Sequence, residues 1–277
     1  MKKRLLCAAL ALALAAGLTG CGSKLEPELP EPSNLRSFSV SAEVTEGAPP
    51  SQSWVLPTEQ TQFSLWPGKE IALLAETEDG SAAVYALPDE NMNGDVGVLV
   101  RWGDVLAEFP WAYATPRCIP PQVWLRDMDG DGAEELAVSC YVGSGTGVSV
   151  EALHVVEQKD GALTDWAVPQ TVFDTLTAQL RVVELHGRTY AMLGPELVDV
   201  TDQLPQEDVT PTGLHFGDVV SFAPAAGMVG MTVNAEGWLE GEGLVATACY
   251  AANVHALVLC KDGQIVIDEM HLDGYGY

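Results

Sequence analysis

The chain combines a hydrophobic composition with a strong negative charge. It has 277 residues, 47% of them hydrophobic, and 39 acidic residues against 13 basic ones give a formal net charge of −26. The hydrophobic content excludes a mostly disordered chain, and the charge argues against nucleic acid or anionic lipid as a partner. An acidic surface also keeps exported proteins soluble, so charge alone does not indicate cation binding.

The N-terminus has the layout of an export signal. Met1–Arg4 is basic, Leu5–Leu18 is apolar, and Leu18–Cys21 reads LTGC. A basic region, an apolar region and a small-residue cleavage site make up a secretory signal peptide. As a helix, the apolar run would extend about 21 Å, short of the roughly 30 Å hydrocarbon core. We therefore predict a signal peptide over residues 1–20 rather than a spanning helix.

The LTGC sequence resembles the lipobox of bacterial lipoproteins, whose cysteine receives a diacylglyceryl group and becomes the new N-terminus. This resemblance implies a lipid anchor on Cys21, with the membrane as a partner, and a location on the extracytoplasmic face of the cell membrane. The alternative is an ordinary signal peptide with an incidental cysteine. Residues 21–36 follow with spaced prolines and like charges, which favour an extended, solvated tether.

Beyond residue 36 the sequence predicts a mainly β, mainly antiparallel fold. Turns such as Asp160-Gly161 and Asp262-Gly263 suit hairpins, because glycine accepts positive φ. One short helix is expected at Pro169–Gln179, where proline occupies the first turn ahead of an apolar stripe, and a turn is expected at Ala251–Asn253. Strand-length apolar or alternating runs occur at residues 38–44, 71–75, 82–87, 96–100, 135–142, 149–157, 180–185, 189–193, 228–233, 244–250, 254–259 and 264–270.

The chain shows no convincing repeat of fixed period, which argues against a full regular propeller. The segment Thr201–Asp208 reads TDQLPQED and marks a soft boundary near residues 200–212. We expect a β-rich domain over residues 37–200 and a C-terminal β-hairpin region over residues 201–277. The alternative is that the C-terminal region belongs to the same domain.

The segment Asp127–Glu135 reads DMDGDGAEE and has the spacing of a calcium loop. Carboxylates at positions 1, 3, 5 and 9 converge when such a loop curls around a hard cation, and glycine at position 6 permits the tight turn. Position 12 is Val138, so a strand follows instead of an EF-hand helix and position 9 must close the site. The alternative is a solvated Asp-Gly turn. The expected calcium ligands are Asp127, Asp129, Asp131, the carbonyl of Ala133, and Glu135.

Together with Gly143–Gly147 and Val148–Glu157, this loop resembles one FG-GAP or VCBS-type repeat, the calcium-loop hairpin of integrin-like propeller blades. The resemblance covers about residues 123–165 and implies a propeller-blade-like hairpin whose ligands fall on the loop residues just named. The chain departs from the family in lacking further clear copies and in having glutamate at position 9. Lone copies are familiar in exported lipoproteins of Gram-positive bacteria, and the whole chain resembles one of these. The resemblance implies a scaffold and no particular activity.

A second segment, Asp89–Asp95, copies positions 1, 3, 5 and 6 of the loop with weaker ligands. Its position 9 is Gly97, so no acid closes it. A hydrogen-bonded turn is therefore favoured over a second cation site.

The cysteines suggest a disulfide. Cys118, Cys140, Cys249 and Cys260 remain after signal removal and acylation, and an even number outside the cytoplasm indicates pairing. We prefer Cys118 with Cys140, because the first lies in a proline-rich loop and the second on a strand soon afterwards. The expected hairpin does not place Cys249 opposite Cys260. Buried free thiols are the alternative.

No catalytic constellation is visible. The five histidines share no metal-ligand spacing, and there is no nucleophile elbow or Cys-His signature. The adjacent Glu134 and Glu135 would point to opposite faces of a strand, and the tryptophans are expected in the core rather than on a sugar platform. We expect a non-catalytic, calcium-stabilised β module at the cell surface, for binding a protein or glycan or for envelope interactions. The alternative is an extracytoplasmic hydrolase acting on polysaccharide or cell-wall material.

Overall fold

The structure, a computed structural model, describes residues 37–61, 68–89, 97–113, 119–204, 210–227, 229–242 and 250–274. The expected signal peptide, the tether with Cys21, Cys118 and Cys249 lie outside these residues, as does the Asp89–Asp95 segment except for Asp89. Within the described ranges, no helix has both the length and the apolar character needed to cross a membrane.

The described chain is mainly β, with antiparallel sheets and a short helix, as predicted. The propeller-blade character of the calcium-loop hairpin stays a prediction. The strands are β1 (Phe38–Ser41), β2 (Glu43–Glu46), β3 (Ala72–Glu76), β4 (Ala82–Ala86), β5 (Val98–Trp102), β6 (Val105–Phe109), β7 (Gln122–Arg126), β8 (Glu135–Gly145), β9 (Val148–Lys159), β10 (Ala162–Ala167), β11 (Arg181–Leu185), β12 (Arg188–Leu193), β13 (Glu196–Asp199), β14 (Thr210–Pro224), β15 (Met231–Glu242), β16 (Tyr250–Lys261) and β17 (Gln264–Gly274).

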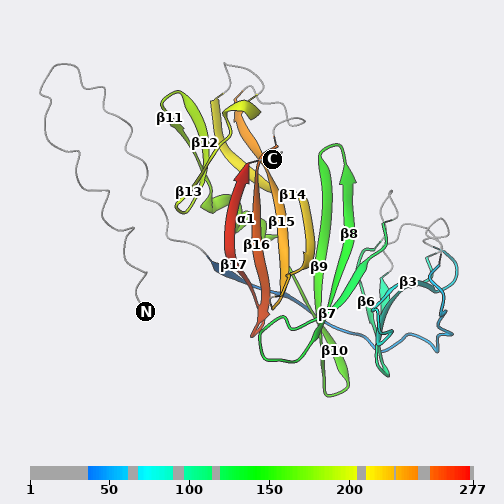
Figure 1. The fold of residues 1–277 in the computed structure, drawn as a ribbon. Coiled ribbons are helices and arrows are strands. Elements are labelled where there is room, and N and C mark those ends of the chain that lie inside the picture. The colour runs from blue at the N-terminus through cyan, green and yellow to red at the C-terminus, as the bar shows by residue number, and fades with distance from the viewer. Residues whose placement is uncertain are drawn as a thin grey trace, which may run out of the picture. The chain divides into compact units, whose positions relative to one another are not determined.

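A 10-stranded sheet forms a nearly closed barrel. Its main path runs β1-β17-β16-β15-β14-β9-β10-β2, and β7 and β8 extend it from the other edge of β9. The two ends of the path are consecutive in sequence: β1 pairs with β17, and β2 pairs with β10. Residues 38–46 therefore run as one strap between the two ends of the sheet (Figure 1). The pairing of β14 with β9 places β14 to β17 in the same sheet as β1, β2 and β7 to β10.

Two hydrophobic cores share β8 as a wall. Successive side chains of a strand point to opposite faces. Leu136, Val138 and Cys140 accordingly lie in the core beneath the four-stranded sheet β3-β4-β5-β6. Ala137 lies in the barrel core. Both faces of this strand are buried, which explains its almost continuous apolar sequence.

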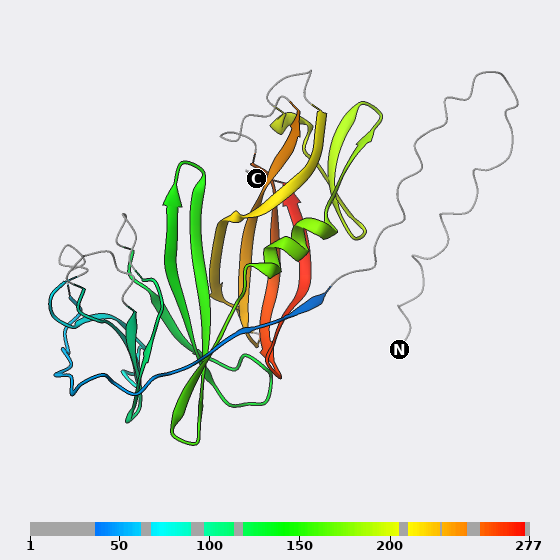
Figure 2. The same ribbon diagram turned by 180° about the vertical axis from the view of Figure 1, so that it is seen from behind.

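Helix α1 (Thr171–Gln179) occupies the expected position and covers the barrel core. Val172, Phe173 and Leu176 are its buried residues, and their spacing is that of one helix face. In Figure 2 the helix lies across the face of the sheet formed by β14 to β17. Leu180 ends the helix with extended backbone at φ −79° and ψ 149°, so the chain passes directly into β11.

The expected turn at Ala251–Asn253 is wrong, because β16 runs straight through these residues. Ala251 and Ala252 are fully buried, and Asn253 pairs with Glu236 on one side and Asp273 on the other. Pairing with two neighbouring strands therefore outweighs the local turn preference of this segment.

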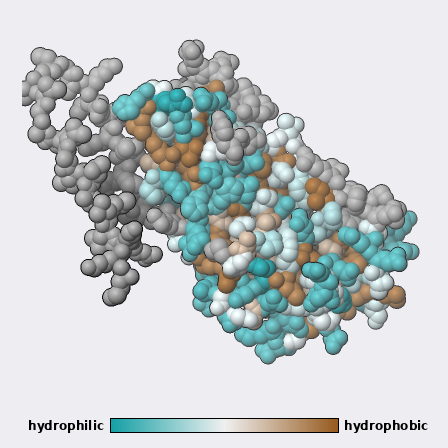
Figure 3. All heavy atoms as spheres, in the orientation of Figure 1, coloured by the Kyte–Doolittle hydropathy of each residue, from teal (hydrophilic) through white to brown (hydrophobic). Residues whose placement is uncertain are grey.

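The three-stranded sheet β11-β12-β13 carries an apolar outer surface. Figure 3 shows brown, apolar residues gathered over this part of the molecule, between hydrophilic regions. Leu197 of β13 is 42% exposed there, whereas its neighbour Val198 packs against the barrel core. One face of this small sheet thus contributes to the core and the other faces outward.

Candidate metal centre

The predicted calcium loop joins β7 to β8. Asp127 directly follows β7, and Glu135 is the first residue of β8. Gly130 and Gly132 have φ angles of 85° and 91°, a conformation that side chains other than glycine adopt at a cost. The two glycines therefore allow the chain to curl and bring the two strand ends close together.

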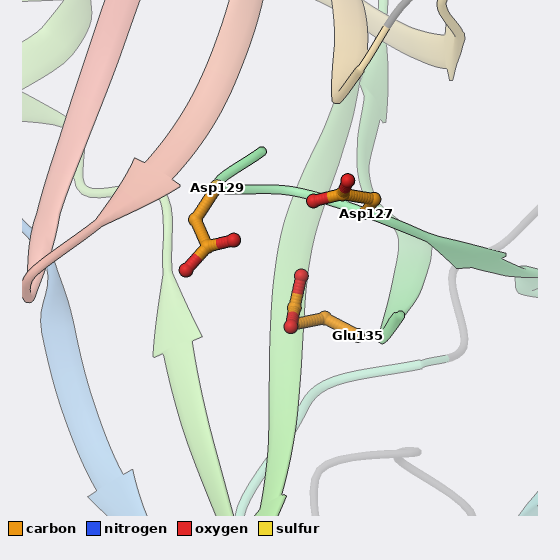
Figure 4. A group of neighbouring side chains, drawn as sticks. All are labelled: Asp127, Asp129 and Glu135. Atoms are coloured by element: carbon orange, nitrogen blue, oxygen red, sulfur yellow. The ribbon is translucent and has the colours of Figure 1, made fainter. Parts of the chain in front are cut away.

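Three of the predicted ligands converge. Carboxylate oxygens of Asp127, Asp129 and Glu135 lie within 4.8 Å of one another, and Figure 4 shows the three carboxylates pointing into a common space. Asp131 is exposed, and its Oδ1 accepts a hydrogen bond from the amide of Ala133 at 2.7 Å. The structure thus brings positions 1, 3 and 9 together, while the roles of Asp131 and the Ala133 carbonyl stay predictions.

Backbone amides hold the carboxylates in place. The two oxygens of Asp127 accept hydrogen bonds from Gly130 at 2.7 Å and Gly132 at 3.1 Å. Asp129 Oδ1 accepts from Asp131 at 2.9 Å, and Glu135 Oε2 accepts from Met128 at 2.7 Å. These bonds fix the loop's shape locally and leave other carboxylate lone pairs for a cation.

The electrostatics of the loop are unfavourable without a counter-charge. Burial raises the pKa of Glu135 from 4.5 to about 7, and repulsion from Asp129, Asp131 and Asp127 adds to this, against the lowering effect of the Met128 amide. A cation among these carboxylates would remove the repulsion and keep Glu135 ionised.

The loop is anchored to the barrel as well as to its own hairpin. Met128 is fully buried in the barrel core. The carbonyls of Asp127 and Met128 accept backbone hydrogen bonds from Gly230 at 2.8 Å and Cys260 at 2.9 Å. The loop therefore connects β7 and β8 to the β14–β15 turn and the end of β16.

The donor set suits a hard cation. The converging ligands are all carboxylate oxygens, the type that calcium and magnesium prefer. Cys260 lies near the loop, but burial, followed by repulsion from Glu135 and Asp129, raises the pKa of its thiol to about 12. A neutral thiol is a poor metal ligand, which disfavours a soft metal here.

The structure leaves the disulfide prediction untested. Among the described residues, Cys140 and Cys260 are not bonded to each other, and Cys140 is fully buried in the core beneath the small sheet. Its predicted partner Cys118 lies outside the described residues.

Sequence reasoning missed a buried polar cluster in the core beneath the small sheet. Asp165 is 1% exposed. One of its carboxylate oxygens accepts a hydrogen bond from Trp111 Nε1 at 2.7 Å and lies 2.8 Å from His154 Nδ1. The Trp111 and His154 rings stack with centroids 4.1 Å apart. The one available signal was the alternation of β10, which places Asp165 on the same face as the buried Leu163.

Comparison with known proteins identifies no relative. No family model matches the chain, and searches of curated proteins and of solved structures return no similar protein.

Proposed function

We propose that the protein is a lipid-anchored, calcium-stabilised β module of the cell surface that binds rather than catalyses. The observation that supports calcium binding is the convergence of Asp127, Asp129 and Glu135 within 4.8 Å. The anchor and the location rest on the lipobox at Cys21, and the loop's place in a strand-flanked hairpin agrees with the resemblance to an FG-GAP or VCBS-type repeat.

Calcium fits this loop better than magnesium. Calcium accepts six to eight oxygen ligands in flexible geometry, whereas magnesium demands a near-ideal octahedron and gives up its water reluctantly. The loop offers carboxylate oxygens from Asp127, Asp129 and Glu135 within 4.8 Å of one another, and further oxygen ligands are expected from Asp131 and the Ala133 carbonyl. Glu135 is half-buried and repelled by the other carboxylates, so a cation beside it would stabilise its charged form.

A structural role for the ion is supported by what surrounds it. The loop is tied by backbone hydrogen bonds to Gly230 and Cys260, so an ion there would stabilise the connection between the hairpin and the barrel. Among the described residues, the candidate metal group contains carboxylates alone, without a histidine or a reactive thiol. When the three carboxylates hold a cation, none of them is free to act as a nucleophile or proton carrier.

A calcium titration of the melting temperature tests the proposal. Extracellular calcium modules bind with Kd of about 10⁻⁴ to 10⁻³ M, so the stabilisation is about 0.4 kcal/mol at a free concentration equal to Kd and about 2.7 kcal/mol at a hundredfold excess. Wild type should melt at a higher temperature as calcium rises to tens of millimolar, and magnesium should do less.

The matched variants are Asp129→Ala, which removes a ligand, and Asp104→Ala, which removes an exposed carboxylate from the β5–β6 turn. Asp129→Ala should abolish the calcium response, and Asp104→Ala should retain it. A wild-type melting curve that does not move over the whole titration would leave the loop as a solvated turn. Loss of a hydrolytic activity in folded Asp129→Ala would instead favour an enzyme.

A further inference from the structure

Two histidines lie side by side on the outer face of the last hairpin of the barrel. His255 of β16 and His271 of β17 are register partners in an antiparallel ladder, so their Cβ atoms lie about 5 Å apart on one face of the sheet. The next pair, Val254 with Leu272, lies in the barrel core, so the histidines point outward. Their side chains are 48% and 68% exposed. Their separation in the sequence matches no metal-binding motif, and strand pairing brings them together.

Two carboxylates flank the histidine pair. Asp273 follows His271 by two residues on β17 and lies on the same face, and its Oδ2 is 3.6 Å from His255 Nε2. Glu196 of β13 reaches the pair from the small sheet. One of its carboxylate oxygens accepts the backbone amide of Leu272, and the other lies 3.1 Å from His271 Nδ1. The amide hydrogen bond therefore holds Glu196 in place beside the His271 ring.

The hydrogen-bonding surroundings of both rings suit metal ligation. A metal-ligating histidine usually donates its other ring N–H to a carboxylate or a carbonyl oxygen. Glu196 offers such an acceptor to His271 Nδ1, which leaves Nε2 for a metal. Asn234, the register partner of His255 on β15, has a buried Oδ1 with no hydrogen-bond partner among the described residues. This oxygen is an acceptor on the neighbouring strand for the Nδ1–H of His255. Exposed ion pairs contribute little to stability, so stability alone does not account for the arrangement.

Side-chain rotation is needed to bring the ligand atoms together. Among the described residues, the carboxylates of the metal loop form the one group of three whose ligand atoms meet within 4.8 Å. Exposed side chains change rotamer within picoseconds to nanoseconds. His255 and Asp273, which is 69% exposed, can therefore turn toward Nε2 of His271 while its Nδ1 stays beside Glu196. The paired backbone already holds both histidines at the separation that a shared ion requires.

We propose that His255, His271 and Asp273 bind a divalent transition-metal ion of the zinc class. The ligands are Nε2 of each histidine and a carboxylate oxygen of Asp273, and Glu196 is a positioning residue that orients His271. Imidazole nitrogens suit zinc and copper, whereas the all-carboxylate loop suits hard cations. Three protein ligands leave a fourth tetrahedral position for water or for a donor from a partner. The site is additional to the proposed calcium site and does not depend on it.

Zinc titration tests the site in the protein that lacks residues 1–20 and carries Cys21→Ser, with accessible thiols alkylated and calcium in large excess. Calorimetry should show one zinc ion bound per chain. His255→Gln and His271→Gln should each weaken binding at least about tenfold, because even a lost orienting partner costs that much. The matched control is His215→Gln, which removes a histidine 3.5 Å from Asp218 and should keep the wild-type affinity. Absence of zinc binding, or equal affinity in all three variants, would overturn the proposal.

Copper reports the ligands directly. Electron paramagnetic resonance of bound Cu²⁺ should show coupling to two imidazole nitrogens in the wild type and to one in His255→Gln or His271→Gln. Glu196→Gln should weaken zinc binding about tenfold and keep both nitrogens, because Glu196 orients a ligand without being one. A wild-type spectrum without nitrogen coupling, or unchanged spectra in the single-histidine variants, would contradict the assignment.

The two metal sites can be tested separately. The calcium loop bonds to β16 at Cys260, and the extended strand back to His255 places the pair about 16 Å away. Asp129→Ala should therefore keep the zinc affinity, and His271→Gln should keep the calcium-dependent melting shift. Loss of zinc binding in Asp129→Ala would place zinc in the calcium loop and overturn the proposal. A missing calcium response with intact zinc binding would instead count against the calcium site alone.

Discussion

Replacing Glu135 by glutamine should stabilise the calcium-free protein and remove its response to calcium. Glutamine keeps an oxygen that accepts the amide of Met128, as Glu135 Oε2 does at 2.7 Å. It removes the charge that burial and Asp129, Asp131 and Asp127 disfavour. The same substitution takes a charged ligand out of the proposed site. Stability without the ion and affinity for it should therefore change in opposite directions.

The magnitude follows from the raised pKa. A pKa raised from 4.5 to about 7 corresponds to at most about 3.4 kcal/mol, and because Glu135 is only half-buried, solvent screening reduces this to about 1–2 kcal/mol. For a folded part of this size, the melting temperature should rise by about 2–8 °C.

The size of the stability gain depends on pH. Because the native-state pKa lies above the unfolded value, the Glu135 carboxyl lowers stability progressively as pH rises from about 4.5 through about 7. The variant's gain should therefore be full at pH 8 and vanish near pH 4.

The assay is differential scanning fluorimetry in chelator at several pH values, repeated with calcium. Glu134→Gln is the matched control. The Glu134 carboxylate is next in sequence to Glu135 but exposed, so its loss should change the free energy of unfolding by less than about 0.5 kcal/mol. A Glu135→Gln protein that melts lower than wild type at pH 8 without calcium would refute the reasoning. An equal gain at pH 4 and pH 8 would do so as well.

Three further outcomes are expected. Cys21→Ser should leave an unlipidated protein that no longer fractionates with membranes; a variant of mature size that stays membrane-bound would rule out the lipid anchor. Non-reducing peptide mapping should find a Cys118–Cys140 bridge, and free thiols at both positions would exclude it. Trp111→Phe keeps a ring in the stack but removes the buried hydrogen bond to Asp165, so urea unfolding should show a loss of about 1.5–3 kcal/mol. An unchanged midpoint would mean that this bond does not stabilise the fold.

The sequence predicted the fold class because alternation of apolar residues is a local signal. It predicted the convergence of Asp127, Asp129 and Glu135 because loop spacing and glycine conformations are local as well. In contrast, β14 escaped prediction: Pro211, Gly213 and Gly217 interrupt its pattern, and its ladder with β15 contains register shifts.

The features that the sequence did not predict depend on contacts between residues far apart in the chain. The strand through Ala251–Asn253 is specified by its neighbours β15 and β17, which no short window reveals. The Trp111–Asp165 hydrogen bond joins residues 54 positions apart. Tertiary pairing, rather than local preference, decides these features.

The strap of residues 38–46 has a consequence for the order of events after synthesis. Phe38 pairs with Ile267, and Ser41 pairs with Gln264. The first strand of the barrel, β1, therefore cannot pair until the last strand, β17, has been synthesised. Contacts of such long sequence separation slow folding, because a long loop must close before they form. A nascent chain that lacks its final hairpin therefore leaves the barrel incomplete. In the exported protein that we propose, this delay would keep the barrel from closing, and so keep the polypeptide competent for translocation, until its C-terminus has crossed the membrane.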